Sequence, residues 1–97
     1  MKFTSTKTRV STAGTRVQLS NVTDRVRYIK VSARTGNSGL VYFGGSAVSS
    51  TVGYELSAND SLELNFGEQG GTVALSTFWA DSSANNHDLD WVAITED

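Results

Sequence analysis

Strict alternation of apolar and polar side chains over residues 61–66 constrains the fold of this chain more than any other feature. Leu62, Leu64 and Phe66 fall on one face of an extended segment, and Glu63 and Asn65 fall on the other. Such a strand packs one face against a core and turns the other to water. Similar short alternations recur along the sequence, and no segment shows the 3.6-residue period of a helix. We therefore expect an all-β fold.

Turn signals separate the candidate strands at intervals of roughly 8 to 12 residues. The expected strands cover residues 15–19, 26–34, 40–43, 61–66, 73–80 and 89–95, and the expected turns or loops include residues 35–39, 57–60, 67–71 and 81–88. Ninety-seven residues suit one domain. The sequence predicts a single small antiparallel β-sandwich over residues 1–97, jelly-roll-like, with about seven or eight short strands.

The first thirteen residues are rich in threonine, serine and basic side chains, and Phe3 is their only aromatic residue. This composition is compatible with a polar edge strand. It also suits a flexible arm that becomes ordered on a partner, because polar terminal segments bury too little apolar surface to order themselves. We expect the arm in the isolated protein.

Charge is distributed unevenly along the chain. Residues 1–34 hold all eight Lys and Arg residues and one Asp, a net charge of +7, and residues 35–97 hold the other nine acidic residues, a net charge of −9. One interpretation is that strands from the two halves pair in one sandwich and neutralise each other. The other is a molecule with a basic side and an acidic side, which would orient it on a charged partner.

Two pairs of adjacent aromatic residues point to a binding surface. Neighbours in a strand face opposite sides, so Tyr42 and Phe43 cannot both enter one core, and neither can Phe78 and Trp79. One residue of each pair faces outward unless a loop or another subunit covers it. An outward aromatic ring is compatible with an oligomer contact, with a carbohydrate-stacking platform, or with ordinary partial cover by its neighbours.

No catalytic or cofactor motif is present, and we expect a protein that is not an enzyme and binds no cofactor. The chain has one histidine and lacks a nucleophile-elbow sequence. His87 lies near Asp81, Asp88 and Asp90 in the sequence, a set that could ligate a divalent metal. The same residues are ordinary in a solvated loop, and we predict no metal site.

Nucleic acid and membrane are not expected as partners. Arg25 and Arg27 have odd positions, whereas Lys30 and Arg34 have even positions, so a strand would not place them on one basic face. The net charge of −2 also opposes binding to a phosphate polymer. No apolar run approaches the roughly 18 residues of a membrane span.

Residues 39–66 carry a longer motif. A strand ending in Val-Tyr-x-Gly-Gly-Ser leads through Val-Ser-Ser to Gly-Tyr-x-Leu, then through a turn into an alternating apolar strand. The residues concerned are Val41, Tyr42, Gly44, Gly45, Ser46, Val48, Ser49, Ser50, Gly53, Tyr54, Leu56, Ser61, Leu62 and Leu64. The motif resembles a pattern of small virion proteins of tailed bacteriophages, often head-associated. Asn59-Asp60 stands where that pattern has a Pro-Gly type of turn.

The resemblance implies a structural protein of the virion, in particular a capsid decoration or cement protein. Such proteins bind the outer surface of the major capsid protein shell, stabilise it, and are commonly homo-oligomers. We expect the chain to be made in the host cytoplasm and to end on the capsid surface. A carbohydrate-binding module or a tail-associated structural module is the alternative. The candidate contact residues are Lys2, Phe3, Lys7, Arg9, Arg16, Tyr42 and Trp79.

Overall fold

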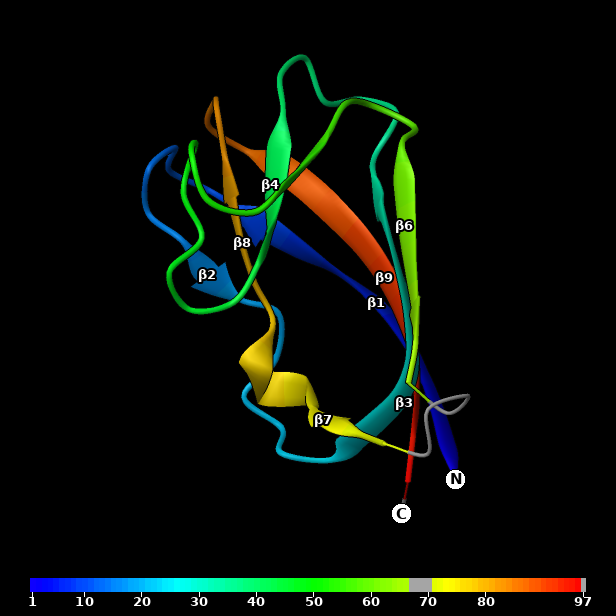
Figure 1. Cartoon of the computed structure of the whole chain (residues 1–97). Coiled ribbons are helices and arrows are strands. Elements are labelled where there is room, and N and C mark those ends of the chain that lie inside the picture. The colour runs from blue at the N-terminus through cyan, green and yellow to red at the C-terminus, as the bar shows by residue number, and fades with distance from the viewer. Residues whose placement is uncertain (67–70, 97) are drawn as a thin grey trace.

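A computed structural model describes residues 1–66 and 71–96. They form two antiparallel sheets that face each other (Figure 1). The large sheet has the strand order β1-β9-β3-β6, with β7 also paired to β3, and the small sheet has the order β2-β8-β4-β5. The elements are β1 (Lys2–Val10), β2 (Val17–Gln18), β3 (Arg25–Ala33), β4 (Val41–Gly44), β5 (Tyr54–Leu56), β6 (Ser61–Asn65), β7 (Val73–Ala74), the short 3-10 helix η2 (Leu75–Thr77), β8 (Trp79–Ser82) and β9 (His87–Thr95).

The pairing of strands is that of a jelly roll. Apart from the two-residue β7, the first strand pairs with the last, the second with the second last, and so on inward to β4 with β5. The chain therefore behaves as one long hairpin. The additional pairs β3–β9 and β4–β8 roll this hairpin into two sheets. The expected all-β, jelly-roll-like sandwich is confirmed.

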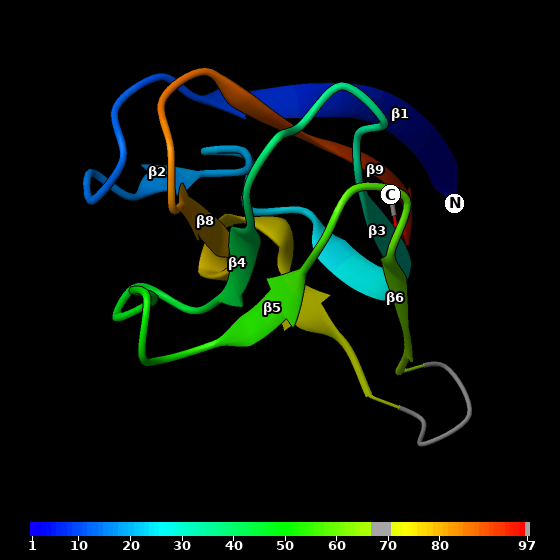
Figure 2. The same ribbon diagram turned by 90° about the horizontal axis from the view of Figure 1, so that it is seen from above.

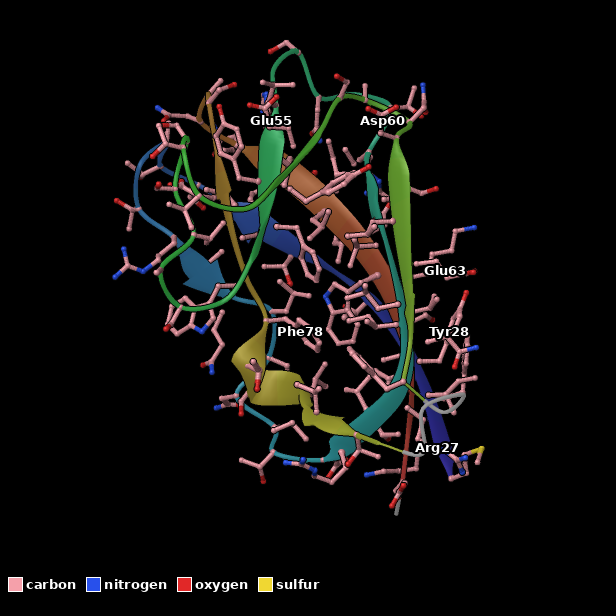
Figure 3. The ribbon with its side chains drawn as sticks, viewed as in Figure 1. Arg27, Tyr28, Glu55, Asp60, Glu63 and Phe78 are labelled. Carbon is pink, nitrogen blue, oxygen red and sulfur yellow. The ribbon has the colours of Figure 1, made fainter. Side chains whose placement is uncertain are left out.

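The core lies between the sheets and is built by alternation. On β3, Ile29 and Val31 are buried, and on β9, Leu89 and Trp91 are buried. Phe43 of β4 stacks on Phe78 with ring centroids 5.5 Å apart. Figure 3 shows Phe78 in the space between the sheets. The buried apolar core consists of Val10, Leu19, Val26, Ile29, Val31, Ala33, Val41, Phe43, Leu56, Leu75, Phe78, Ala80, Leu89, Trp91 and Ala93.

A β-bulge in β3 breaks the alternation. Val26 pairs with Thr95, and Tyr28 pairs with the adjacent Ile94, so Arg27 is the extra residue. The bulge allows Val26 at an even position and Ile29 at an odd position to face the same core. It also places Arg25 on the outward side of β3, so the expected separation of this arginine from Lys30 by parity is wrong.

Residues 73–80 do not form the single strand that the sequence predicted. Strand β7 ends at Ala74, η2 turns the chain at Leu75, and β8 begins at Trp79. The turn lets Leu75 and Phe78 both enter the core. The predicted turn at residues 57–60 is confirmed, with Asn59 at φ 74° and the Asp60 N–H donating to the Ser57 carbonyl at 2.9 Å. Most of the loop expected at residues 67–71 lies outside the described residues.

The expected polar loop at residues 81–88 is much shorter. Asp81 and Ser82 belong to β8, and His87 and Asp88 belong to β9, and all four side chains are buried. Only residues 83–86 connect the two strands. Alternation alone did not reveal these strand ends, because their inward and outward positions both carry polar side chains.

The N-terminal segment forms an edge strand. Residues 2–10 pair with β9 in one unbroken register, from Lys2 opposite Thr95 to Val10 opposite His87. Of the two alternatives for this segment, the structure has the edge strand and not the mobile arm. Its residues 2–7 are nonetheless exposed. Among the described residues, no helix is long and apolar enough to cross a membrane.

Candidate functional site

The outer face of the large sheet is a broad surface that no described loop covers. In Figures 1 and 2 the described loops lie beside the small sheet and at the ends of the sandwich, and none crosses this face. Opposed residues of antiparallel strands share a face, so the register defines its rows from β1 to β6. The rows are Phe3, Ile94, Tyr28 and Asn65, then Ser5, Val92, Lys30 and Glu63, then Lys7, Asp90, Ser32 and Ser61.

The first two rows contain an apolar patch. Phe3 is 68% exposed, and the neighbouring Ile94, Val92 and Tyr28 are half-buried. The Tyr28 hydroxyl donates to a carboxylate oxygen of Glu63 at 2.5 Å, and Figure 3 shows both side chains pointing away from the core. This hydrogen bond is the main reason that the pKa of Tyr28 is raised above its usual 10.0. Exposed aromatic and aliphatic groups side by side are typical of the centre of a protein interface.

Charged residues cross the other end of the same face. Asp88 of the central strand β9 accepts two hydrogen bonds from Arg9 of β1, at 2.9 and 3.2 Å. Asp90 lies 3.3 Å from the Arg34 guanidinium beyond β3. The hydrogen bond from Arg9 lowers the pKa of Asp88 below its usual 3.8, against the opposing effect of burial. The acidic β9 is therefore flanked by basic strands, and the uneven charge along the sequence is largely neutralised within one sheet.

An open depression of about 500 Å³ lies between the apolar patch and these ion pairs. Its lining includes Lys7, Lys30, Arg34 and Asp90 together with the hydroxyls of two serines. Arg34 is paired with Asp90, and the Lys7 ammonium lies 4.0 Å from Asp88, whereas the Lys30 side chain makes no hydrogen bond or ion pair with the described part of the chain. Three basic residues and one acid line the depression, which thus offers a net positive charge next to apolar surface and suits a partner that presents carboxylates.

Three of the seven predicted contact residues lie together on the outer face of the large sheet, and the other four do not. Phe3, Lys7 and Arg9 lie on the outer face of the large sheet. Lys2 has the opposite parity and pairs with Asp24 at 2.5 Å. The other three lie away from this face: Arg16 is exposed just before β2, and Tyr42 and Trp79 face outward from the small sheet.

Tyr42 is buried and not an exposed contact. It faces away from the core cluster, as parity required, but only 6% of it is exposed. Two loops cover this outer face. The Gly14 N–H donates to Asp81, the residue opposite Tyr42, at 3.0 Å, and Val48 packs against Gly44 on the neighbouring position. Trp79, the first residue of β8, is half-buried.

Sequence reasoning missed several residues of the large-sheet face, notably Tyr28, Lys30, Asp90 and Val92. Alternation separated these positions from the core-facing ones, so their outward direction could be predicted. Which strands pair could not be predicted, because no local sequence pattern places β1 beside β9 or β9 beside β3. The face exists only once these strands, distant in sequence, become neighbours.

The residues weighed as metal ligands bind other groups. The His87 Nε2 accepts the Gly39 N–H at 2.7 Å, and Asp81 accepts the backbone N–H groups of Gly14 and Ser82. Asp88 is held by Arg9. In the described ranges, no group of three or more His, Cys, Asp or Glu side chains is arranged to hold a metal ion.

Comparison with known proteins yields similarity of structure only. No family model and no curated protein sequence matches the chain. The metallopeptidase IMPa from Pseudomonas aeruginosa, solved in complex with an O-glycopeptide, is similar with a TM-score of 0.56 and 9% identity over 97% of this chain, which spans 13% of IMPa. The SPBc2 prophage-derived protein YomS is similar with a TM-score of 0.52 and 9% identity, covering 98% of this chain and 96% of YomS. The chain therefore shares the fold of a prophage-derived protein over nearly the whole length of both.

Proposed function

We propose that this chain is a structural protein of a tailed-phage virion, and more closely a capsid decoration protein that binds the outer surface of the major capsid protein shell and stabilises it. Three observations support the proposal. The motif at residues 41–64 resembles small virion proteins, the fold matches prophage-derived YomS along both chains, and one sheet face is uncovered. The first two suggest the location, and the third suggests how the chain binds.

The observation that carries the proposal is the make-up of the large-sheet face. Its apolar patch around Phe3 and Val92 adjoins the cationic depression at Lys7 and Lys30. Interfaces commonly have an apolar centre and a polar rim, and charge complementarity at the rim guides orientation. We therefore assign the shell contact to this face, with the apolar patch at its centre and the lysines against acidic groups of the capsid protein.

Immunogold electron microscopy of particles from a producing lysate tests the location. Antibody against the purified chain should label heads over their whole surface. Label confined to tails would replace decoration by the tail-associated role, and particles without label would contradict a virion role altogether.

Charge reversal tests the assigned face on purified particles. The double variant Lys7→Glu/Lys30→Glu should bind heads stripped of the native protein at least tenfold more weakly than the wild type. Arg16→Glu is the matched control, since it reverses an exposed cation outside this face. Equal losses in both variants, or retained binding by the double variant, would contradict the assignment.

A carbohydrate-binding module is the second candidate. One observation favours it: Trp79 is only half-buried on the outer side of the small sheet, where the neighbouring aromatic Tyr42 is covered. A partly open indole can stack on a sugar ring. A glycan-array screen should then give saturable binding that Trp79→Ala abolishes and Tyr28→Ala retains. Absence of any glycan signal would remove this candidate.

A further inference from the structure

Strand β1 is the edge of the large sheet and the longest edge strand of the described fold. Its nine residues exceed the five of β6 at the opposite edge, and the small sheet ends in β2 and β5, with two and three residues. An edge strand presents backbone N–H and C=O groups on one side that a further strand can bind. Figure 2 shows no described segment alongside the N-terminal part of β1 on the side away from β9.

The exposure of β1 changes along its length. Residues 2–7 are all exposed, whichever way their side chains point, whereas Val10 is fully buried. Near the buried end, the Thr8 hydroxyl donates to the Leu19 carbonyl, which ties this part of β1 to the segment after β2. Residues 2–7 are therefore open, and the half-buried Thr8 ends a segment of seven residues, 2–8, that has no neighbouring strand on one side.

Symmetry restricts how two copies of this stretch can pair. In an antiparallel pair opposed residues lie on the same face of the sheet. A two-fold axis perpendicular to the sheet must therefore run between the two copies of one residue, so that this residue pairs with itself and not with its neighbour in the sequence. Centring the open stretch places Ser5 on the axis. The resulting pairs are Lys2 with Thr8, Phe3 with Lys7, Thr4 with Thr6, and Ser5 with its symmetry mate.

These pairs bring no like charges together. Threonine is well suited to strands, and two of the four pairs contain it. Lysine on an edge strand normally discourages pairing. In this register Lys7 lies opposite Phe3 of the other copy, where its aliphatic stem can pack beside the exposed ring while its ammonium group stays in water.

The other edge strands are less suited to pairing with their own symmetry mates. Full overlap of β6 with its symmetry mate centres on Glu63, and full overlap of β5 centres on Glu55, so each would oppose two carboxylates directly. Like charges opposite each other destabilise an antiparallel pair. Strand β2 has only two residues. Length and charge therefore select β1 among the four edges.

We propose that two copies of this chain associate edge to edge through β1, antiparallel, with Ser5 at the two-fold axis. The dimer joins the two large sheets into one continuous sheet. Both apolar patches and both depressions then lie on one side of it, because a two-fold axis perpendicular to the sheet preserves faces. Two linked contact surfaces would strengthen attachment to a repetitive surface. The pairing itself does not depend on the virion role and is tested without particles.

Sedimentation equilibrium of the purified chain should give twice the 10.4 kDa of one copy at high concentration. Ser5→Lys and Ser5→Glu should each be monomeric, because each places like charges opposite each other at the axis. An equimolar mixture of the two variants should restore the dimer mass. Ser61→Lys on β6 is the control and should remain dimeric. A monomeric wild type, a dimeric Ser5→Lys variant, or a mixture that stays monomeric would overturn the proposal.

Crosslinking gives a second readout that is independent of charge. The chain has no cysteine, so Ser5→Cys introduces one thiol per copy. Opposed residues of antiparallel strands have Cα atoms about 4.5 to 5.5 Å apart, within disulfide range. Mild oxidation should convert Ser5→Cys, but not Ser61→Cys, to a covalent dimer. Equal crosslinking of both variants would indicate random collision and contradict pairing through β1.

Discussion

Loops cover the outer face of the small sheet, whereas no described loop covers the outer face of the large sheet. On the small sheet, the outward residues Tyr42 and Asp81 are only 6% and 4% exposed, because two loops fold over them. On the large sheet, the outward Phe3 is 68% exposed. The chain thus covers one aromatic residue and leaves another in water. We infer that the small-sheet face contributes to stability and that the large-sheet face is available for binding.

Strand length explains the difference. The large sheet contains three strands of nine residues, and their long ladders of backbone hydrogen bonds stabilise the sheet without a covering loop. The strands of the small sheet have two to four residues and make few ladder hydrogen bonds. Loops packed on its outer side supply the missing contacts.

Truncating the covered aromatic should have the largest effect. Tyr42→Ala removes a buried ring and should lower the free energy of unfolding by about 3 kcal/mol. Phe3→Ala removes an exposed ring and should cost less than about 0.5 kcal/mol. Urea denaturation of both variants measures the difference. Equal losses would show that the two faces do not differ in their contribution to stability.

Disturbing the loop over the small sheet should have the next largest effect. Gly53 has φ +127°, and a Cβ atom there would lie 2.7 Å from Val48 Cγ2 and 2.9 Å from the Phe43 carbonyl oxygen. Gly53→Ala should therefore destabilise the fold by about 2 kcal/mol. Gly45→Ala is the matched control, since nothing lies within 4 Å of its Cβ position. Equal melting temperatures for the two variants in thermal unfolding would contradict close packing of this loop.

Acid should weaken the charged end of the large sheet. The pKa of Asp88 is lowered in the folded protein, chiefly by its hydrogen bond from Arg9, so the fold favours the ionised carboxylate. The resulting stability is present above the usual value of 3.8 and is lost as the pH falls through the lowered folded pKa. Unfolding free energies from about pH 6 to about pH 3 should fall more steeply for the wild type than for Asp88→Asn. Parallel curves would contradict this linkage.

The smallest effect concerns Tyr28 on the outer face of the large sheet. The pKa of Tyr28 is raised mainly by its hydrogen bond to Glu63, so this residue should ionise above the usual 10.0. Ultraviolet titration of the wild type and of Glu63→Gln should show one phenol whose pKa falls in the variant. Tyr28→Phe identifies that phenol. An unchanged titration in Glu63→Gln would show that the hydrogen bond is absent in solution.

Much of the fold could be predicted from the sequence because alternation is local. The inward set of β9 and the inward half of β3 follow from the residues themselves, and so does the turn at Asn59. The predictions failed where another influence outweighed local pattern. The bulge at Arg27 shifts the parity of β3, and η2 interrupts the expected strand before Trp79. Both adjust the chain to core positions that only the opposite sheet defines.

The candidate site was only partly predictable, for a related reason. Phe3, Lys7 and Arg9 were identified from composition, whereas Tyr42 was placed on the surface because parity specifies a direction and not what lies there. By itself the sequence determined the all-β class, the faces of most strands and the charge of each half. Tertiary structure alone decided which strands pair, and thus that β9 lies between β1 and β3, that their charges neutralise, and which face remains bare. These features depend on contacts between residues far apart in the chain, which no local pattern specifies.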